Sequence, residues 1–547
     1  MQNTTGEKLV ESWLDRQTEK RYQSALLQLL NAEGWSILHN TRHNALEFGK
    51  DIIARDPSGK LVALQLKGNP GSRLTKSQAQ SMLPQVLELL EVPVPETYQL
   101  HPDERHAAVI VTNGEVEEES LLEFEKIGLR TQKGSCSADR LMVWGRGELL
   151  SRFRNKVSDV WSTDIEGMRL VLETFASDGQ SLIDTEALSN LLVHSIGVPT
   201  LAMRSPEKDS RISSALLLGE IIKAPWYASE NHYVLFQIST MLAIFCLRYA
   251  DDVSRLAVIR AYDGVIVDHC RDLIQEAQER SFEAEFTWAQ FSPLDEIDIM
   301  KERLRLVADV CATLVLSGAE LSEADKAFVI TTLGKSVPPG SIWGEGAIPS
   351  LIVRYWALRR LDPTVMPDQL LRGALIALVR AARHGEPAPP SPYYNFEECL
   401  YLYSGGQLGT ESDIADDSSK NRSWFSFTLM QMLAKRNWKQ TCRNAWQAFS
   451  KLLHERVDLP LDAFFDARLV KAGRAVTTPL YSDTWHNLVK SAVENDNPGF
   501  PHAFADRAWL IASYVALVPY RAWQPVMMWL DTQLSCTWYN REHLPEL

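Results

Sequence analysis

The sequence predicts an N-terminal α/β domain followed by a large all-α region. Residues 1–155 alternate short strand-like runs with helical patterns, an order typical of helices packed around a small central mixed sheet. After about residue 157 the strand signal fades, and long segments with a 3.6-residue period dominate. The Pro-rich stretch 385–392 favours a division of this region into helical domains over residues 156–384 and 393–547, although the two could also be continuous.

The elements of the first domain follow from hydrophobic periodicity and from turn residues. A helix is expected over residues 18–33, where apolar residues recur at helical spacing and Gly34 marks the stop. Strands are expected at Trp35–His39, Asp51–Arg55, Leu61–Lys67, Ala107–Thr112 and Leu141–Trp144, and further helices at Ser77–Glu91 and Glu117–Ile127. The second region is expected to contain helices such as Asp164–Phe175, Tyr233–Arg248, Met300–Leu316, Leu370–Arg383, Trp424–Arg436 and Arg507–Leu517.

Composition excludes several classes of protein. The chain has 547 residues, of which 45% are hydrophobic and 23% charged, values that argue against a disordered or fibrous protein. The net charge of −14 excludes a generally basic nucleic-acid coat, and most of the acidic excess lies after residue 155. The seven cysteines form no CxxC pair, the N-terminus is polar, and no run reaches the ~20 apolar residues of a membrane span. A soluble, cytoplasmic protein is therefore expected.

The most informative segment is Leu46–Gly68, which predicts a β-hairpin. The sequence Asp-Pro-Ser-Gly at 56–59 suits a type I turn with Gly59 in the left-handed region, which gives a three-residue loop. Residue 56 then pairs with residue 60, and counting back places Asp51 opposite Gln65. Lys67 lies two residues beyond Gln65 and should project from the same face. The hairpin therefore gathers a carboxylate, an amide and an ammonium group, while apolar side chains occupy the other face.

This cluster suits metal-assisted hydrolysis of a phosphodiester. Mg²⁺ prefers hard oxygen ligands, which Asp51, the Gln65 amide and the Leu66 carbonyl could supply. Lys67 would orient the attacking water and offset charge that develops on the phosphoryl oxygens. The simpler interpretation is a surface hairpin whose Asp51 and Lys67 form an exposed ion pair.

The surrounding segments resemble the Mrr-like branch of the PD-(D/E)XK nucleases, which have the restriction-endonuclease fold. The matching segments, in order, are the first helix Tyr22–Leu30 with Gly34-Trp35, the GxD-like Gly49-Lys50-Asp51, the QxK-like Gln65-Leu66-Lys67, the strand and turn Val109–Gly114, and the closing segment Leu141–Leu150. The resemblance covers roughly residues 15–155. It implies catalytic roles for Asp51, Gln65 and Lys67, and Mg²⁺ or Mn²⁺ as the cofactor.

One position departs from the family pattern. The family's first-helix acid falls at Gln23, which carries no negative charge. Glu19 is one helical turn earlier and faces the same way, and Glu47 precedes Asp51 by four residues. Either acid could complete a metal site, and each could equally be a solvated side chain.

The resemblance implies an endonuclease that hydrolyses nucleic acid, with DNA as the expected substrate, of the kind found in restriction and anti-phage defence. Arg73 and Lys76 follow the hairpin and are candidate contacts to the phosphate backbone, although an ordinary solvated loop explains them as well. No P-loop is present, so a built-in ATP motor is not expected.

The role of the helical region is an expectation from its size and charge. We expect it to sense, regulate or oligomerise, and we expect a homodimer or larger complex because cutting both strands of a duplex requires two active sites. The alternative is a non-catalytic helical interaction protein, with a degenerate nuclease fold that binds nucleic acid or a protein partner. The neutral residue at position 23 is the feature that favours this alternative.

Overall fold

The computed structural model divides the chain into two compact units, residues 1–265 and 266–547. It describes residues 5–40, 49–130, 136–158, 165–196, 206–248, 253–279, 293–334, 344–361, 367–383, 392–394, 398–399, 401, 422–457, 464, 475–479, 485–494, 504 and 506–535. The division between the units falls within helix α11 (Val253–Glu279). The expected boundary at residue 155 falls within α5 (Arg146–Ser158), and that near 385–392 lies almost wholly outside the described residues.

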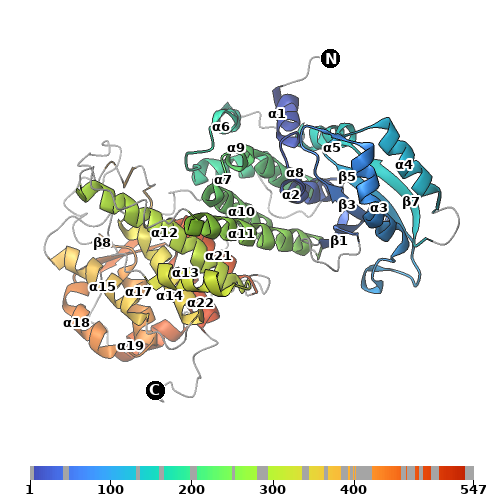
Figure 1. Ribbon diagram of the computed structural model, residues 1–547. Coiled ribbons are helices and arrows are strands. Elements are labelled where there is room, and N and C mark those ends of the chain that lie inside the picture. Colours follow the sequence, from blue (N-terminus) through green and yellow to red (C-terminus); the bar gives the residue numbers. More distant parts are fainter. Residues whose placement is uncertain are drawn as a thin grey trace. The chain divides into compact units, whose positions relative to one another are not determined.

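A mixed five-stranded sheet forms the centre of the N-terminal region, as the sequence predicts (Figure 1). Its strands are β1 (Ser36–Asn40), β2 (Ile52–Arg55), β3 (Leu61–Lys67), β5 (His106–Thr112) and β7 (Ala138–Trp144). They lie in the order β1-β2-β3-β5-β7, with the first two pairings antiparallel and the last two parallel. The short strands β4 (Arg73–Leu74) and β6 (Glu115–Val116) pair separately, in the segments that follow β3 and β5. Because β3, β5 and β7 are parallel, their C-terminal ends lie at the same edge of the sheet.

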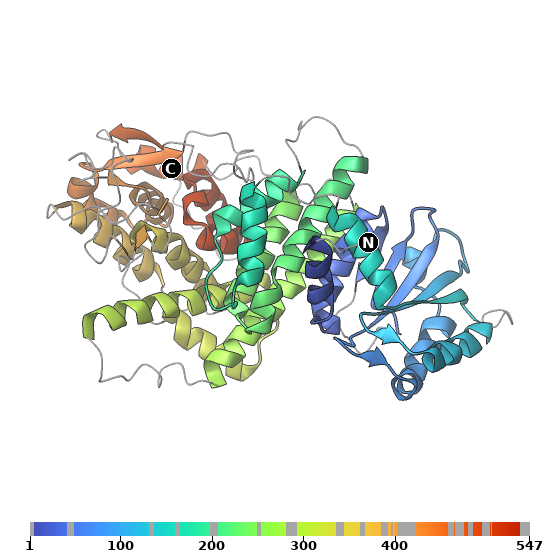
Figure 2. The ribbon, with the colours of Figure 1, turned by 90° about the horizontal axis from the view of Figure 1, so that it is seen from above.

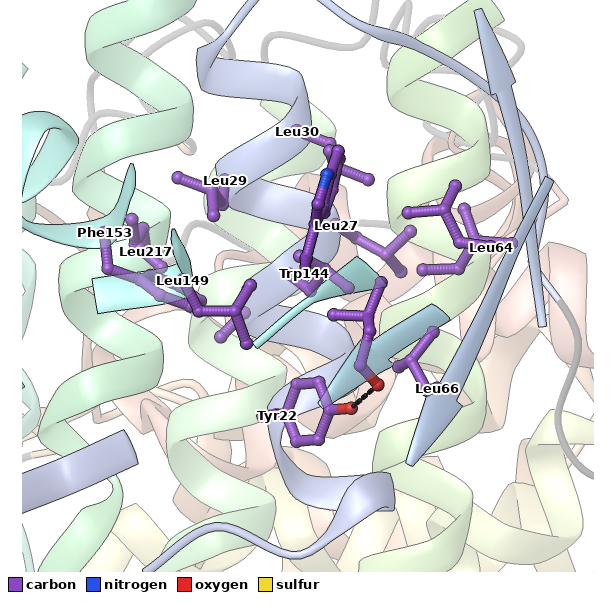
Figure 3. Close-up of a cluster of buried hydrophobic side chains, with 14 of the residues drawn as sticks. Tyr22, Leu27, Leu29, Leu30, Leu64, Leu66, Trp144, Leu149, Phe153 and Leu217 are labelled. Carbon is purple, nitrogen blue, oxygen red and sulfur yellow. Dashed lines mark hydrogen bonds between the residues drawn. The ribbon is translucent and has the colours of Figure 1, made fainter. Parts of the chain in front are cut away.

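Helices cover both faces of this sheet, which explains why its central strands are apolar on both sides (Figures 1 and 2). One face packs against α1 (Thr5–Leu14), α2 (Glu19–Ala32) and α5, and its cluster is drawn in Figure 3. The other face packs against α3 (Lys76–Glu91) and α4 (Glu118–Gly128). A capping box of Thr75 and Gln78 fixes the first turn of α3.

Further helices belong to the first unit. They are α6 (Ile165–Ala176), α7 (Thr185–Ile196), α8 (Pro206–Ile222), α9 (Ala224–Ala228) and α10 (His232–Arg248). Helix α8 lies along α2, and its residues Leu217 and Ile221 belong to the same buried cluster as the sheet. Leu217 is labelled in Figure 3. The hydrophobic core around the sheet therefore extends beyond residue 155.

The second unit is largely helical, as expected. Its described helices are α12 (Pro293–Ser317), α13 (Glu323–Gly334), η4 (Gly344–Ala347), α14 (Ile348–Leu361), α15 (Asp368–Arg383), α17 (Ser426–Lys435), α18 (Lys439–Phe449), α19 (Trp485–Glu494), α21 (Ala508–Leu517), η8 (Pro519–Arg521) and α22 (Gln524–Ser535). It also contains a small sheet that the periodicity did not predict, made of β8 (Arg422–Ser423), β9 (Leu453–Val457) and β10 (Ala475–Pro479). Within the described part of the chain, no helix is both long and apolar enough to cross a membrane.

Candidate active site

The hairpin of β2 and β3 has the predicted register. Ile52 pairs with Leu64 and Arg55 with Leu61, so the next residue before β2, Asp51, lies opposite Gln65. The turn also forms as expected, with Gly59 at a φ of 85° and its N–H donating to the Asp56 carbonyl. The face that carries Gln65 is polar only at the strand ends, because the preceding residues of that face pack against α3. Its polar groups are thus gathered at one edge of the sheet.

Gly49 brings the chain into β2 by passing close to α3. Its φ is +68°, and a Cβ atom at this position would lie 2.7 Å from the Gln85 carbonyl oxygen and 3.1 Å from the Leu89 nitrogen. A side chain therefore fits neither the backbone conformation nor the space. The glycine of the Gly49-Lys50-Asp51 segment is required so that Asp51 can reach its place beside β3.

The Asp51 carboxylate accepts hydrogen bonds from the part of β3 that extends beyond its pairing with β2. The last backbone contact is from the Asp51 N–H to the Leu64 carbonyl, at 2.9 Å. Beyond it, Asp51 Oδ2 accepts from the Leu66 N–H at 2.6 Å and from Gln65 Nε2 at 2.7 Å. Asp51 is only 4% exposed and Gln65 only 5%, so these hydrogen bonds are shielded from solvent.

The Gln65 amide nitrogen lies near two oxygen atoms of other residues, whereas the amide's own oxygen has no partner among the described residues. Its Nε2 lies 2.7 Å from Asp51 Oδ2 and 3.5 Å from the Leu66 carbonyl oxygen. Its Oε1 is buried, with no hydrogen-bond partner among the described residues. A buried amide oxygen without a donor is costly, and such groups in native proteins call for an explanation.

Lys67 and Glu19 lie together at the end of β3. The Lys67 ammonium is 3.8 Å from Glu19 Oε2, and both side chains are partly exposed. The same Glu19 oxygen accepts from the Gly68 N–H at 3.2 Å. Gly68 allows this contact, because a Cβ there would lie 2.5 Å from the Glu19 nitrogen. The structure thus brings Glu19, one of the two candidate second acids, beside Lys67.

Tyr22 is a site-supporting residue that the sequence analysis treated only as part of the helix pattern. Its hydroxyl is buried within hydrogen-bond distance of the Lys67 carbonyl and the Val111 carbonyl, each at 3.1 Å, and it accepts from the Lys67 N–H at 3.2 Å. Figure 3 shows Tyr22 among the buried side chains, with a dashed line for one of its hydrogen bonds. Burial raises the pKa of Tyr22 well above its ordinary value, and the carboxylates of Glu19 and Asp51 add to this shift. Its position one turn after Glu19, within an otherwise apolar stripe, is the signal that could have identified it.

Lys50 is a second group that sequence reasoning passed over. It is 2% exposed, and its ammonium donates to the Glu88 carbonyl near the end of α3, at 3.3 Å. Burial lowers the pKa of Lys50 to about 8. A cation at a helix C-terminus stabilises the helix dipole, so Lys50 fixes the segment before Asp51 against α3.

The described residues among the remaining candidates make other contacts. Gln23 donates from Nε2 to Asn40 Oδ1 at 2.7 Å, and Glu47 lies outside the described residues. The side chains of Arg73 and Lys76 are 69% and 48% exposed and form ion pairs with Glu115 at 3.5 Å and Glu119 at 3.2 Å. Exposed ion pairs of this kind contribute at most about 1 kcal/mol, so a phosphate could replace the acid at either residue.

The donor set at the end of β3 fits a hard divalent cation. The Asp51 carboxylate, the Leu66 carbonyl and Gln65 Oε1, which has no partner among the described residues, all supply oxygen, as Mg²⁺ and Mn²⁺ prefer. Adjacent ligand oxygens around Mg²⁺ are about 3 Å apart, and the Nε2 atom of the Gln65 amide lies at comparable distances from Asp51 Oδ2, 2.7 Å, and from the Leu66 carbonyl oxygen, 3.5 Å. These three residues could therefore hold such an ion, and Lys67 follows Leu66 directly in the chain at the end of β3.

Comparison with known proteins adds no assignment, because no family model, no curated protein and no solved structure matches this chain.

Proposed function

We propose that the N-terminal region is a metal-dependent endonuclease of the PD-(D/E)XK type, which hydrolyses phosphodiester bonds. The observation that carries the proposal is a pair of contacts near the C-terminal end of β3, Asp51 with the Gln65 amide and Lys67 with Glu19. Two antiparallel pairings followed by two parallel ones are compatible with this fold. The five sequence segments that resemble the Mrr-like branch occur in the same region.

Each residue has a distinct role in the proposed reaction. Asp51, the Leu66 carbonyl and Gln65 would hold Mg²⁺ or Mn²⁺, which would supply Lewis-acid activation of water and phosphate. Lys67 orients the attacking water and offsets charge on the phosphoryl oxygens. Glu19 holds the Lys67 ammonium in position through their contact, and Tyr22 fixes the backbone of Lys67 on both sides.

Nucleic acid is the substrate class, with DNA preferred, and the proposed setting is restriction or anti-phage defence. Arg73 and Lys76 are exposed in the segment after β3, so they are suitably placed to contact a phosphate backbone. Double-strand cleavage would require two such sites, which is why we propose a homodimer or larger complex.

Cleavage by the full-length protein tests the proposal. Wild-type protein should cut at least one of duplex DNA, single-stranded DNA or RNA in Mg²⁺ or Mn²⁺, and Lys67→Ala should reduce the rate at least 100-fold. Lys60→Ala is the matched control, since Lys60 lies in the same hairpin but pairs with Asp139 at 2.6 Å. Cleavage by Lys67→Ala at the wild-type rate would contradict the mechanism.

A non-catalytic nucleic-acid-binding protein is the second candidate. It is favoured by Gln23, which pairs with Asn40 and supplies no acid, and by the neutral Gln65. Nucleic-acid binding that is unaffected by chelation of divalent metals, with no cleavage of any substrate, would support this candidate over the enzyme.

A further inference from the structure

The orientation of the Gln65 carboxamide depends on what lies beside Asp51. An amide oxygen placed 2.7 Å from a carboxylate oxygen would be repelled, so without a cation the Nε2 group must face Asp51. This orientation gives Asp51 a buried hydrogen bond, but it leaves Oε1 buried without a described partner. In this orientation the amide Nε2 has a hydrogen-bond acceptor, whereas the amide Oε1 has no donor among the described residues.

We infer that the Gln65 carboxamide switches between two orientations, one that closes the cation site and one that supplies a ligand to it, and we call this switch the latch. In the metal-free state its NH₂ group occupies the space between Asp51 and the Leu66 carbonyl. When a divalent cation binds, the amide turns over, so that Oε1 joins these two oxygens as a ligand and the Nε2 group leaves Asp51. The inference rests on the proposed function, because it concerns the same cation site.

The latch has a consequence for affinity. A cation must break the hydrogen bond between Gln65 and Asp51 before it gains the amide oxygen, and hydrogen bonds to buried charged groups are among the stronger ones. Of the three ligands only Asp51 carries a formal charge, so the attraction of the site for a cation offsets little of this cost. Without a bound cation, the orientation with Nε2 beside Asp51 is therefore favoured. Binding is then weaker than at a site with two carboxylates, where no internal donor competes with the cation.

Calorimetric titration of Mn²⁺ into the full-length protein tests the latch without any measurement of activity. Gln65→Met keeps the approximate volume but removes both the donor and the oxygen ligand, and it should bind at least tenfold more weakly than wild type. Gln65→Glu adds a charged oxygen and should bind at least tenfold more tightly. Gln99→Met is the matched control. The Gln99 amide also donates from Nε2, at 2.6 Å, and its Oε1 has no partner in the described part of the chain, but its acceptor is the Val94 carbonyl.

Reorientation can also be observed directly. In protein labelled with ¹⁵N only at glutamine, the side-chain NH₂ signal that disappears in Gln65→Glu belongs to Gln65. Mg²⁺ should shift this signal, because the group leaves a carboxylate, while the Gln99 signal stays in place. Binding of Mg²⁺ with an unchanged Gln65 signal would overturn the latch.

The remaining outcomes separate the latch from the proposed function. If Gln65→Met binds Mn²⁺ as tightly as wild type or more tightly, and Asp51→Asn abolishes binding, the amide is only an obstruction and the latch is wrong, whereas the cation site stands. If neither wild type nor Gln65→Glu binds Mn²⁺ or Mg²⁺, the metal-dependent nuclease and the latch both fail.

Discussion

At the level of single residues, Asp51 contributes to stability as well as to the proposed chemistry. Asp51 directly precedes β2, and its carboxylate accepts from the Leu66 N–H as a backbone carbonyl of a longer β2 would. The two groups that donate to this carboxylate, the Leu66 N–H and Gln65 Nε2, are buried, so loss of the carboxylate leaves them without this acceptor and away from water. Lys67 differs, because its ammonium is partly exposed and 3.8 Å from Glu19.

We therefore expect Asp51→Ala and Lys67→Ala to differ in stability. Asp51→Ala should lower the free energy of unfolding by about 1–3 kcal/mol, the cost of leaving a buried donor unsatisfied. Lys67→Ala should change it by less than about 1 kcal/mol, since a partly exposed ion pair contributes little. Urea denaturation of both variants checks this difference. Equal losses of stability would mean that Asp51 does not support β3 as described.

At the level of elements, the passage from Gly49 into β2 depends on contact with α3. Gly49 and Gly59 both have positive φ, but only Gly49 lies against another backbone, while nothing lies within 4 Å of a Cβ at Gly59. Gly59→Ala should cost about 1–2 kcal/mol for the left-handed conformation alone. Gly49→Ala should cost about 3 kcal/mol or more, because overpacking against α3 adds to that strain. Denaturant melts of the two variants test this, and similar losses would contradict the close approach to α3.

Glu345 makes the start of α17 sensitive to pH. Its carboxylate accepts from the backbone N–H groups of Trp424 at 2.7 Å and Phe425 at 2.9 Å. Burial raises the pKa of Glu345 from about 4.5 to about 7. The folded state then binds the proton more tightly than the unfolded chain, so this contribution to stability is complete below about pH 4.5 and is lost as pH rises through about 7.

Replacing this ionisable group should flatten the pH dependence. Glu345→Gln keeps an oxygen acceptor for the two N–H groups but has no charge to desolvate. We expect it to raise stability at pH 8 by on the order of 2–3 kcal/mol relative to its effect at pH 4.5. Thermal unfolding of both proteins across this range measures the difference. A constant difference between wild type and variant would show that Glu345 does not titrate in this window.

At the level of the whole molecule, α2 contacts both the sheet and helix α8 of the same unit. One side of α2 carries Tyr22 toward β3, and another lies along α8. There Ser24 donates to Glu220 at 2.9 Å, and Glu220 pairs with Lys223 at 2.8 Å, in a fully buried contact. Without Glu220 the buried Ser24 hydroxyl would lose this acceptor, so α2 depends on α8 for a polar contact as well as for apolar cover.

A fragment of residues 1–155 is therefore expected not to fold on its own. It lacks Leu217 and Ile221, each of which contributes about 1.5–3 kcal/mol by burial, and it exposes the polar side of α2. A fragment of residues 1–279 retains α8 and the whole of α11 and should fold. Circular dichroism melts of the two fragments compare them. A cooperative transition in the shorter fragment, at the temperature of the longer one, would show that α8 is dispensable.

The sequence by itself determined the hairpin, the order of the strands along the chain and the helical character of the second region. These features depend on local signals: alternation within β2 and β3, the turn at residues 56–59, and the 3.6-residue period of the later helices. Because a three-residue loop sets the pairing of the strands that it joins, counting from the turn was enough to place Asp51 opposite Gln65.

Only the tertiary structure decided that Glu19 lies beside Lys67, which way the Gln65 amide points and where the core around the sheet ends. Glu19 reaches the site through Gly68, 49 residues away, and Ser24 meets Glu220 across 196 residues. The small sheet of β8, β9 and β10 likewise joins short strands from separated segments. Contacts between distant segments leave no trace in local periodicity, because they are selected by packing and by the pairing of buried polar groups once the elements meet.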